Sequence, residues 1–118
     1  MDIIYINNYE EFLIYLKNEG NNNNYQLVFL DYYFIHNMGI KLLKNTIDSI
    51  NLNQKIKIIF NCKDSLSYTL FAIESKITYI IYECNYDNLS NLQKLANSYN
   101  ALIFQSIEKS IEYFKNIY

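Results

Sequence analysis

The 118-residue sequence has no proline, no tryptophan and no arginine, and it has only two glycines, two cysteines and one histidine. Without arginine it lacks the side chain that grips phosphate and guanine through two parallel hydrogen bonds. With only Gly20 and Gly39 it also lacks the glycine-rich loop that cradles a nucleotide or flavin phosphate. We therefore expect no nucleic-acid partner and no cofactor.

The sequence also lacks a long apolar run. None approaches the roughly 18 residues that a membrane span needs, and the start at Met1–Ile6 has neither the basic segment nor the cleavage site of a signal peptide. Cys62 and Cys84 are not spaced as a CxxC pair, so without an export signal they are expected to be reduced thiols. These features predict a cytoplasmic protein with no membrane association.

Isoleucine, asparagine and tyrosine dominate the composition, with 19, 18 and 13 copies. Their codons are rich in A and T, so much of this bias reflects base composition, and the identity of any one such residue carries little information. The hydrophobic share of 51% is ample for a core, and the net charge is only -2. Length and composition together predict one globular domain spanning residues 1–118.

Short apolar runs alternate with amphipathic segments along the whole chain. The runs are rich in β-branched and aromatic residues, which is typical of strands that are buried on both faces. They are Ile3–Ile6, Gln26–Leu30, Ile56–Phe60, Thr78–Tyr82 and Ala101–Phe104. We expect each of them to be a strand.

The segments between the runs carry apolar residues three or four positions apart, as in helices that cover a sheet. The expected stripes are Tyr9, Phe12, Leu13 and Leu16; Ile40, Leu43, Ile47 and Ile50; Leu66, Leu70 and Ile73; Leu89, Leu92, Leu95, Ala96 and Tyr99; and Ile107, Ile111 and Phe114. Asn8 with Glu11 resembles a capping box, and Asp64 stands where a later helix needs an N-cap. Gly20 suits the end of the first helix, before a polar loop at Asn21–Asn24.

Regular alternation of strands and helices implies parallel strands joined by right-handed crossovers. The fold class is therefore α/β. We predict a three-layer, doubly wound, flavodoxin-like sheet of five parallel strands with the order 2-1-3-4-5. Ligands of such sheets bind beyond the carboxyl ends of the strands.

The residues at these strand ends are polar but chemically sparse. They are Asn7 and Asn8, Asp31, Asn61 and Cys62, Glu83 and Cys84, and Gln105 and Ser106. In the expected order Asp31 and Glu83 lie too far apart to share a cation, so we expect no metal site. A thiolate nucleophile at Cys62 or Cys84 would need a nearby base, and the single histidine, His36, is expected in a loop far from both. A non-enzymatic role is favoured, with a small thiol-dependent enzyme as an alternative.

The element order resembles that of response-regulator receiver domains over the whole chain. The matching segments are Ile3–Asn8 followed by Glu10, Glu11 and Phe12; Ile58–Asn61; Tyr79–Cys84; and Ala101–Ser106. At every chemical position this sequence departs from the family. Asn7 and Asn8 replace the metal-binding acids, Asn61 the phosphorylated Asp, Glu83 the hydroxyl residue and Gln105 the Lys. The resemblance implies a pseudo-receiver that cannot be phosphorylated in the usual way.

Two other alignments give alternative switches. A second receiver register makes Asp31 the phosphoacceptor, with Gly39 eight residues later, but one strand–helix unit is then missing before Asp31. Phe34–Ile40 also resembles a segment of STAS domains, the anti-sigma-factor-antagonist family. In that alignment Asn37 or Met38 replaces the phosphorylated Ser.

The sequence as a whole therefore predicts a regulatory or signalling module that works by binding another protein. Tyrosine is enriched at protein interfaces, and the tyrosines expected on the surface are Tyr32, Tyr33, Tyr82, Tyr113 and Tyr118. By analogy with receivers, the last helix is also expected to offer a homodimer face.

Overall fold

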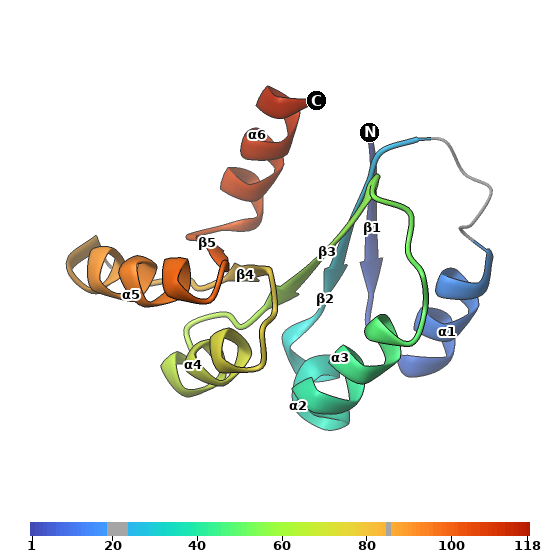
Figure 1. Cartoon of the computed structure of the whole chain (residues 1–118), viewed down its shortest axis with the longest axis horizontal. Coiled ribbons are helices and arrows are strands. Elements are labelled where there is room, and N and C mark those ends of the chain that lie inside the picture. Colours follow the sequence, from blue (N-terminus) through green and yellow to red (C-terminus); the bar gives the residue numbers. More distant parts are fainter. Residues whose placement is uncertain (19–23, 85) are drawn as a thin grey trace.

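Five parallel strands form one sheet, with six helices packed on it, within residues 1–18, 24–84 and 86–118, which the computed structural model describes (Figure 1). The strands are β1 (Asp2–Ile6), β2 (Gln26–Leu30), β3 (Ile56–Asn61), β4 (Tyr79–Ile81) and β5 (Leu102–Phe104). The helices are α1 (Tyr9–Asn18), α2 (Tyr32–Met38), α3 (Ile40–Asp48), α4 (Leu66–Glu74), α5 (Tyr86–Ser98) and α6 (Ile107–Ile117). The predicted α/β class with five parallel strands is confirmed.

The predicted strand order, 2-1-3-4-5, is wrong. Each strand pairs with the next one in the sequence, which gives the order β1-β2-β3-β4-β5. The sequence pattern could not distinguish the two orders, because strand–helix alternation is the same in both. The sheet therefore has no point at which the direction of winding reverses.

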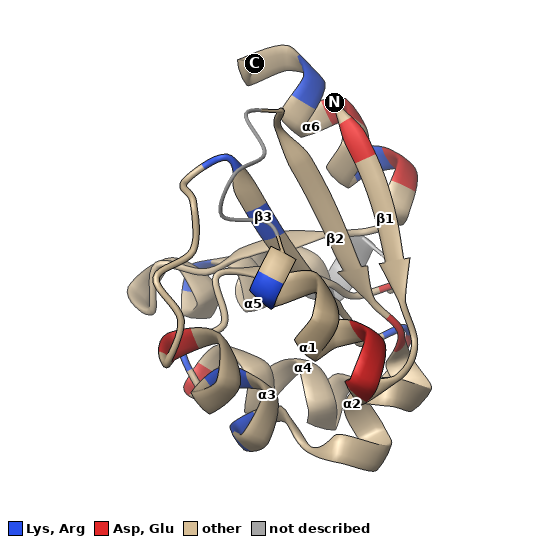
Figure 2. Ribbon diagram, turned by 90° about the vertical axis from the view of Figure 1, so that its right-hand side faces the viewer, with Lys and Arg blue, Asp and Glu red and all other residues tan. Residues whose placement is uncertain are grey.

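This order decides which face of the sheet each helix covers. Right-handed crossovers that all advance in one direction place their helices on the same face. Helices α1 to α5 accordingly share one core cluster with the sheet, whereas α6 packs on the opposite face through a second cluster around Phe114 (Figure 1). The view from the β1 edge shows charged residues spread over several elements, without a block of one sign (Figure 2).

Burial on both faces explains the continuous apolar character of the central strands. All five residues of β2 are buried, with Val28 and Leu30 in the larger core and Leu27 and Phe29 in the core under α6. The edge strand β1 is less covered, since Ile3 and Tyr5 are exposed on the α6 side. The two chain ends lie close together, because Tyr118 stacks on Tyr25 at 4.0 Å and the backbone of Tyr25 pairs with Asp2.

Several local expectations are confirmed or corrected by the helices. Asn8 does cap α1, as its Oδ1 accepts the Glu11 N–H at 2.8 Å. Helix α4 is capped by Ser65 and not by Asp64. It buries Thr69, Ala72 and Ile73 and leaves Leu66 exposed, so its buried face differs from the predicted apolar stripe. Gly20 and Asn21–Asn23 lie outside the described residues.

The segment after β2 contains one helix more than the sequence predicted. Residues Tyr32–Met38 form α2, a short helix that ends at Gly39, whose φ of 85° favours glycine. His36 therefore lies in a helix and not in the expected loop. No helix in the described part of the chain has the length and apolar character needed to cross a membrane.

Candidate functional site

The carboxyl ends of β1, β2 and β3 surround a small pocket of about 240 Å³, here called the strand-end pocket. Its lining residues are Tyr5, Ile6, Asn7, Phe29, Leu30, Asp31, Asn61 and Ile107. Because β2 lies between β1 and β3, Asp31 lies between the strand ends that carry Asn7 and Asn61. The pocket thus combines one carboxylate with two side-chain amides above an apolar base.

Two of the five residues expected in a degenerate receiver pocket line this pocket, namely Asn7 and Asn61. Asn8 instead uses its side chain to cap α1. Glu83 and Gln105 follow β4 and β5, on the other side of β3 from Asn7, and Gln105 Oε1 accepts a hydrogen bond from Lys109 Nζ at 2.9 Å. The structure therefore separates the five residues into a pocket pair and three others.

The two polar residues at the carboxyl ends of β2 and β3 each use one oxygen to hold the local backbone. Asn61 Oδ1 accepts the Lys63 N–H at 3.0 Å, and Asp31 Oδ2 accepts the Tyr33 N–H at 3.1 Å to cap α2. Asn61 is only 9% exposed, so its amide is positioned firmly beside the pocket. A single carboxylate is a poor ligand set for a hard divalent cation, and no cluster of three or more His, Cys, Asp or Glu occurs among the described side chains.

The loop after β3 is held tightly and places a cation against the aromatic rings at the start of α2. Lys63 has φ of 48°, a left-handed conformation that costs a side-chain-bearing residue about 1–2 kcal/mol. Its N–H donates to Asn61 and its carbonyl accepts the Glu83 N–H at 2.7 Å, which together fix the loop against β4. The Lys63 ammonium lies 4.4 Å from the centre of the Tyr33 ring and 5.8 Å from that of Tyr32.

An aromatic cluster joins α2 to α4 next to this lysine. We define it as Tyr32, Tyr33, His36 and Tyr68. The ring centres of Tyr32 and Tyr68 lie 5.7 Å apart and those of His36 and Tyr68 lie 5.2 Å apart, and the Tyr68 hydroxyl hydrogen-bonds to His36 Nδ1. Tyr33 is 61% exposed, so the cluster is accessible from solvent.

Apolar surface continues from the aromatic cluster along α4. Tyr68 shares a shallow cavity with Phe71, which is itself exposed and lies 5.8 Å below the ammonium of Lys41. The sequence predicted Tyr32 and Tyr33 as surface residues but missed His36 and Tyr68. The spacing of Tyr32, Tyr33 and His36 over one helical turn was a usable signal, but it required α2 to be recognised as a helix.

The remaining expected surface tyrosines divide between surface and core. Tyr113 and Tyr118 on and after α6 are exposed, whereas Tyr82 is 6% exposed, so its expected surface position is wrong. Burial is the main reason that the pKa of Tyr82 is raised, with smaller contributions from the charges of Cys84 and Asp64.

Both cysteines are poor nucleophiles at neutral pH. Burial raises the pKa of Cys62 to about 12, although a hydrogen bond with Thr69 lowers it slightly. Burial also raises the pKa of Cys84. Because the thiolate is the reactive form, these environments give no support to thiol chemistry at the strand ends.

Comparisons with known proteins give no match. No protein-family model matches the sequence, and neither a curated protein nor a solved structure is significantly similar to it.

Proposed function

We propose that this protein is a regulatory module that binds another protein through the aromatic cluster. The observation that carries this proposal is a contiguous aromatic surface, in which the half-buried Tyr32 and Tyr68 lie between exposed Tyr33 and exposed Phe71. Aromatic side chains are enriched at protein interfaces, where they bury much area while losing little conformational freedom.

The contacts within the cluster support a binding role, because they order the side chains before a partner arrives. Tyr32 touches Tyr33, His36 and Tyr68, and Lys63 holds the face of Tyr33. A surface that is already ordered loses less entropy on association than a mobile one. The left-handed backbone at Lys63 is consistent with this view, since strain of this kind is concentrated at functional sites.

Asp31 connects the strand-end pocket to the aromatic cluster. Its carboxylate lines the pocket and also caps α2, the helix that carries Tyr32, Tyr33 and His36. A change in the charge or bonding of Asp31 would therefore act on the position of the proposed binding surface. This coupling is the physical basis for a signalling role.

A photocrosslinking experiment tests the proposed surface. A benzophenone amino acid at position 33 is expected to crosslink one discrete partner in cells, whereas the same group at position 113, which is also exposed but lies on α6, is not. In the wild-type background, Tyr33→Ala combined with Tyr68→Ala should abolish recovery of this partner, and Tyr113→Ala should not. Equal crosslinking from both positions, or no dependence of recovery on Tyr33 and Tyr68, would rule out this surface.

A second candidate function is a switch in which Asp31 accepts a phosphoryl group. It is favoured by the position of Asp31 between Asn7 and Asn61, whose amides could donate hydrogen bonds to phosphoryl oxygens. In this reaction an Asp31 carboxylate oxygen attacks the phosphorus of acetyl phosphate, acetate leaves, and an acyl phosphate forms. Intact-mass measurement should then show one added phosphoryl group in the wild-type chain and none in Asp31→Asn. An unchanged mass in both proteins would eliminate this candidate.

A further inference from the structure

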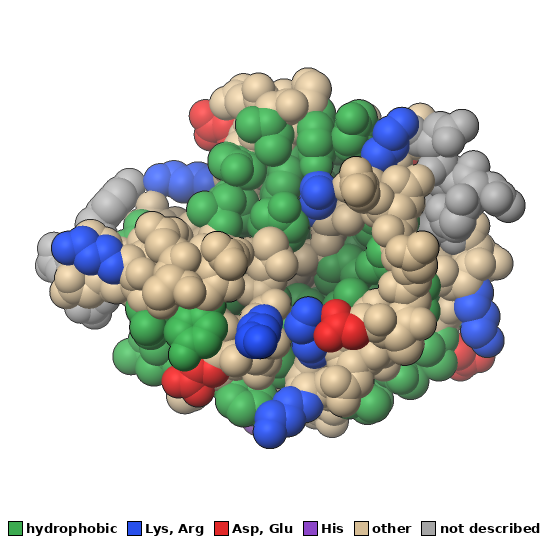
Figure 3. All heavy atoms as spheres, viewed as in Figure 1, with side chains coloured by type: hydrophobic (Ala, Val, Ile, Leu, Met, Phe, Trp, Pro, Cys, Tyr) green, Lys and Arg blue, Asp and Glu red, His purple; other side chains and the backbone are tan. Residues whose placement is uncertain are grey.

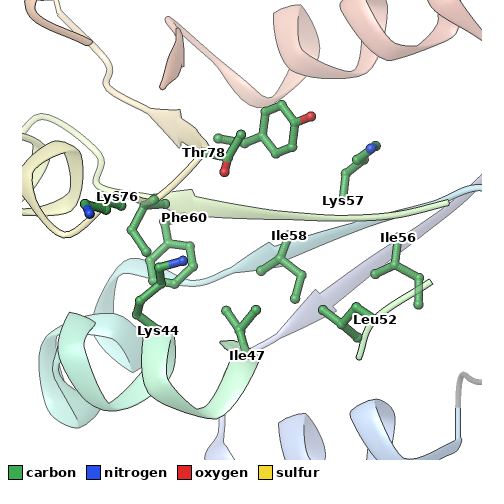
Figure 4. Close-up of a pocket in the computed structure, with 11 residues that line it drawn as sticks. Lys44, Ile47, Leu52, Ile56, Lys57, Ile58, Phe60, Lys76 and Thr78 are labelled. Carbon is green, nitrogen blue, oxygen red and sulfur yellow. The ribbon is translucent and has the colours of Figure 1, made fainter. Parts of the chain in front are cut away.

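A groove lies between α3, the start of β3 and the segment that leads from α4 into β4, with a volume of about 270 Å³ (Figure 4). We call it the lysine groove and define it by Ile47, Ile58 and Phe60, which form an apolar floor, and by Lys44, Lys57 and Lys76 at its border. Figure 3 shows a hollow in this face of the molecule, with apolar side chains inside it and lysine side chains around it. It lies at the opposite end of the strands from the aromatic cluster.

The groove exists because β4 is shorter than β3. Pairing between the two strands begins at Ile59 and Tyr79, so Ile56–Ile58 have no β4 residue beside them. Successive side chains of a strand point to opposite faces, and yet Lys57 and Ile58 line the same groove. Both side chains can reach the groove from opposite faces because no strand pairs with β3 beside these two residues.

The apolar floor of the groove is more exposed than is usual for side chains at the centre of a sheet. Ile58 lies on the middle strand, on the face covered by α1 to α5, but it is only half-buried, as is Ile47 on α3. Its neighbour along the strand, Phe60, is fully buried. An aliphatic side chain entering the groove would therefore contact Ile47 and Ile58 and remove their exposed surface from water.

The border of the groove is positively charged. Lys44 is paired with Asp48 at 2.9 Å within α3. Within the described part of the chain, Lys57 and Lys76 have no carboxylate within ion-pair distance, and no acidic side chain lines the groove. This local positive charge contrasts with the net charge of -2 for the whole chain.

We propose that the lysine groove binds an extended, acidic segment of a partner protein, which lies alongside the open edge of β3. The Ile56 N–H already donates to the Asn53 carbonyl at 3.0 Å, but the backbone beside Ile58 can pair with the main chain of such a segment, as in other cases where a peptide extends a sheet. One aliphatic side chain of the segment occupies the apolar floor, and carboxylates on either side of it pair with Lys57 and Lys76. This site is separate from the aromatic cluster, so the two proposals can fail independently.

Selection from a library of short random peptides displayed on phage tests this proposal directly. The wild-type protein is expected to enrich peptides that combine an aliphatic residue with flanking Asp or Glu. Reversing the border charges with Lys57→Glu and Lys76→Glu should weaken binding of these peptides by about tenfold or more, because two attractive pairs become repulsive. The reversed protein should in turn enrich basic peptides.

The matched control carries Lys17→Glu and Lys94→Glu, which change the net charge equally on exposed positions of α1 and α5. This control should keep the acidic preference, which separates the groove from overall charge. The milder pair Lys57→Gln and Lys76→Gln, checked by circular dichroism, provides a folded variant if charge reversal disturbs the protein. It should weaken binding in the same direction.

Three outcomes would overturn the proposal. One is enrichment of peptides that lack acidic residues, or of none. Another is binding that is equally sensitive to the control pair. The third is a concentration-dependent dimer, seen by sedimentation, that the groove variants alone abolish, since the occupant would then be a second copy of this chain. In each case binding through the aromatic cluster, measured by crosslinking from position 33, remains a separate result.

Discussion

Replacement of Phe114 by alanine should remove the main attachment of α6 to the sheet. Phe114 is fully buried, and its ring lies 5.1 Å from that of Tyr79 and 5.8 Å from that of Phe104. It is the one fully buried apolar side chain of α6, since Ile107 and Ile111 are only partly covered. Loss of the ring leaves a cavity above Phe104 that no other described helix can fill.

The size of the effect follows from the chemistry of the site. Truncation of a buried Phe to Ala costs about 3–5 kcal/mol, against a total stability of about 6–18 kcal/mol for a domain of this length. Phe114→Leu keeps most of the volume and should cost less than about 1.5 kcal/mol. The exposed neighbour Tyr113 gives the control, since Tyr113→Ala leaves no enclosed cavity and should cost clearly less than Phe114→Ala.

Urea unfolding followed by circular dichroism measures these differences, and hydrogen exchange of the α6 amides shows whether the helix detaches locally. We expect Phe114→Ala to lower the free energy of unfolding by the amount above, or to leave global unfolding less affected while the α6 amides lose their protection. A loss of under about 1 kcal/mol with α6 protection unchanged would refute the assignment of Phe114 as the anchor.

Three further predictions concern single groups. Because the pKa of Cys62 is raised to about 12 in the folded state, the unfolded thiol ionises first as pH rises above its ordinary value. Stability should therefore be unaffected by Cys62 below about pH 8.5 and fall by up to about 1.4 kcal/mol per unit between there and pH 12; alkaline unfolding of Cys62→Ala should lack this component. Tyr15→Phe removes the hydroxyl that donates to the side-chain oxygen of buried Gln26. Loss of this donor should lower the free energy of unfolding by about 1–3 kcal/mol, measured by urea unfolding. Ser106→Ala removes the N-cap of α6, which bonds the Lys109 N–H at 3.1 Å, and should cost about 1 kcal/mol, so an unchanged melting curve would contradict that role.

Local residue patterns were sufficient to place most of the elements. The predicted strand at Gln26–Leu30 matches β2. Each of the other four predicted strands differs from the observed one by a single residue at one end or at both ends. The sequence missed α2, because Tyr32–Met38 is too short to show a clear helical stripe and follows β2 after a single residue. The sequence pattern also misplaced the buried face of α4. Thr69 and Ala72 are in the core, whereas Leu66 is exposed.

The candidate sites depended on information that local patterns do not contain. Strand order places Asp31 between Asn7 and Asn61, whereas the predicted order 2-1-3-4-5 would have placed Asn7 in the middle and Asp31 at the edge of the sheet. His36 and Tyr68 are 32 positions apart in the chain, and only the packing of α2 beside α4 brings them into contact. The lysine groove results from the shortness of β4 relative to β3, which the apolar run at Thr78–Tyr82 concealed.

The sequence by itself determined the α/β class, because a strand that is buried on both faces and a helix that is buried on one have different apolar periods. Tertiary structure alone decided which strands are neighbours and therefore which face each helix covers. The physical reason is that strand pairing uses backbone groups common to all residues, so the order is selected by how the side chains of the whole core fit together. In this chain that selection leaves α6 as the only described helix on one face of the sheet, and it leaves the β3 edge open beside Lys57.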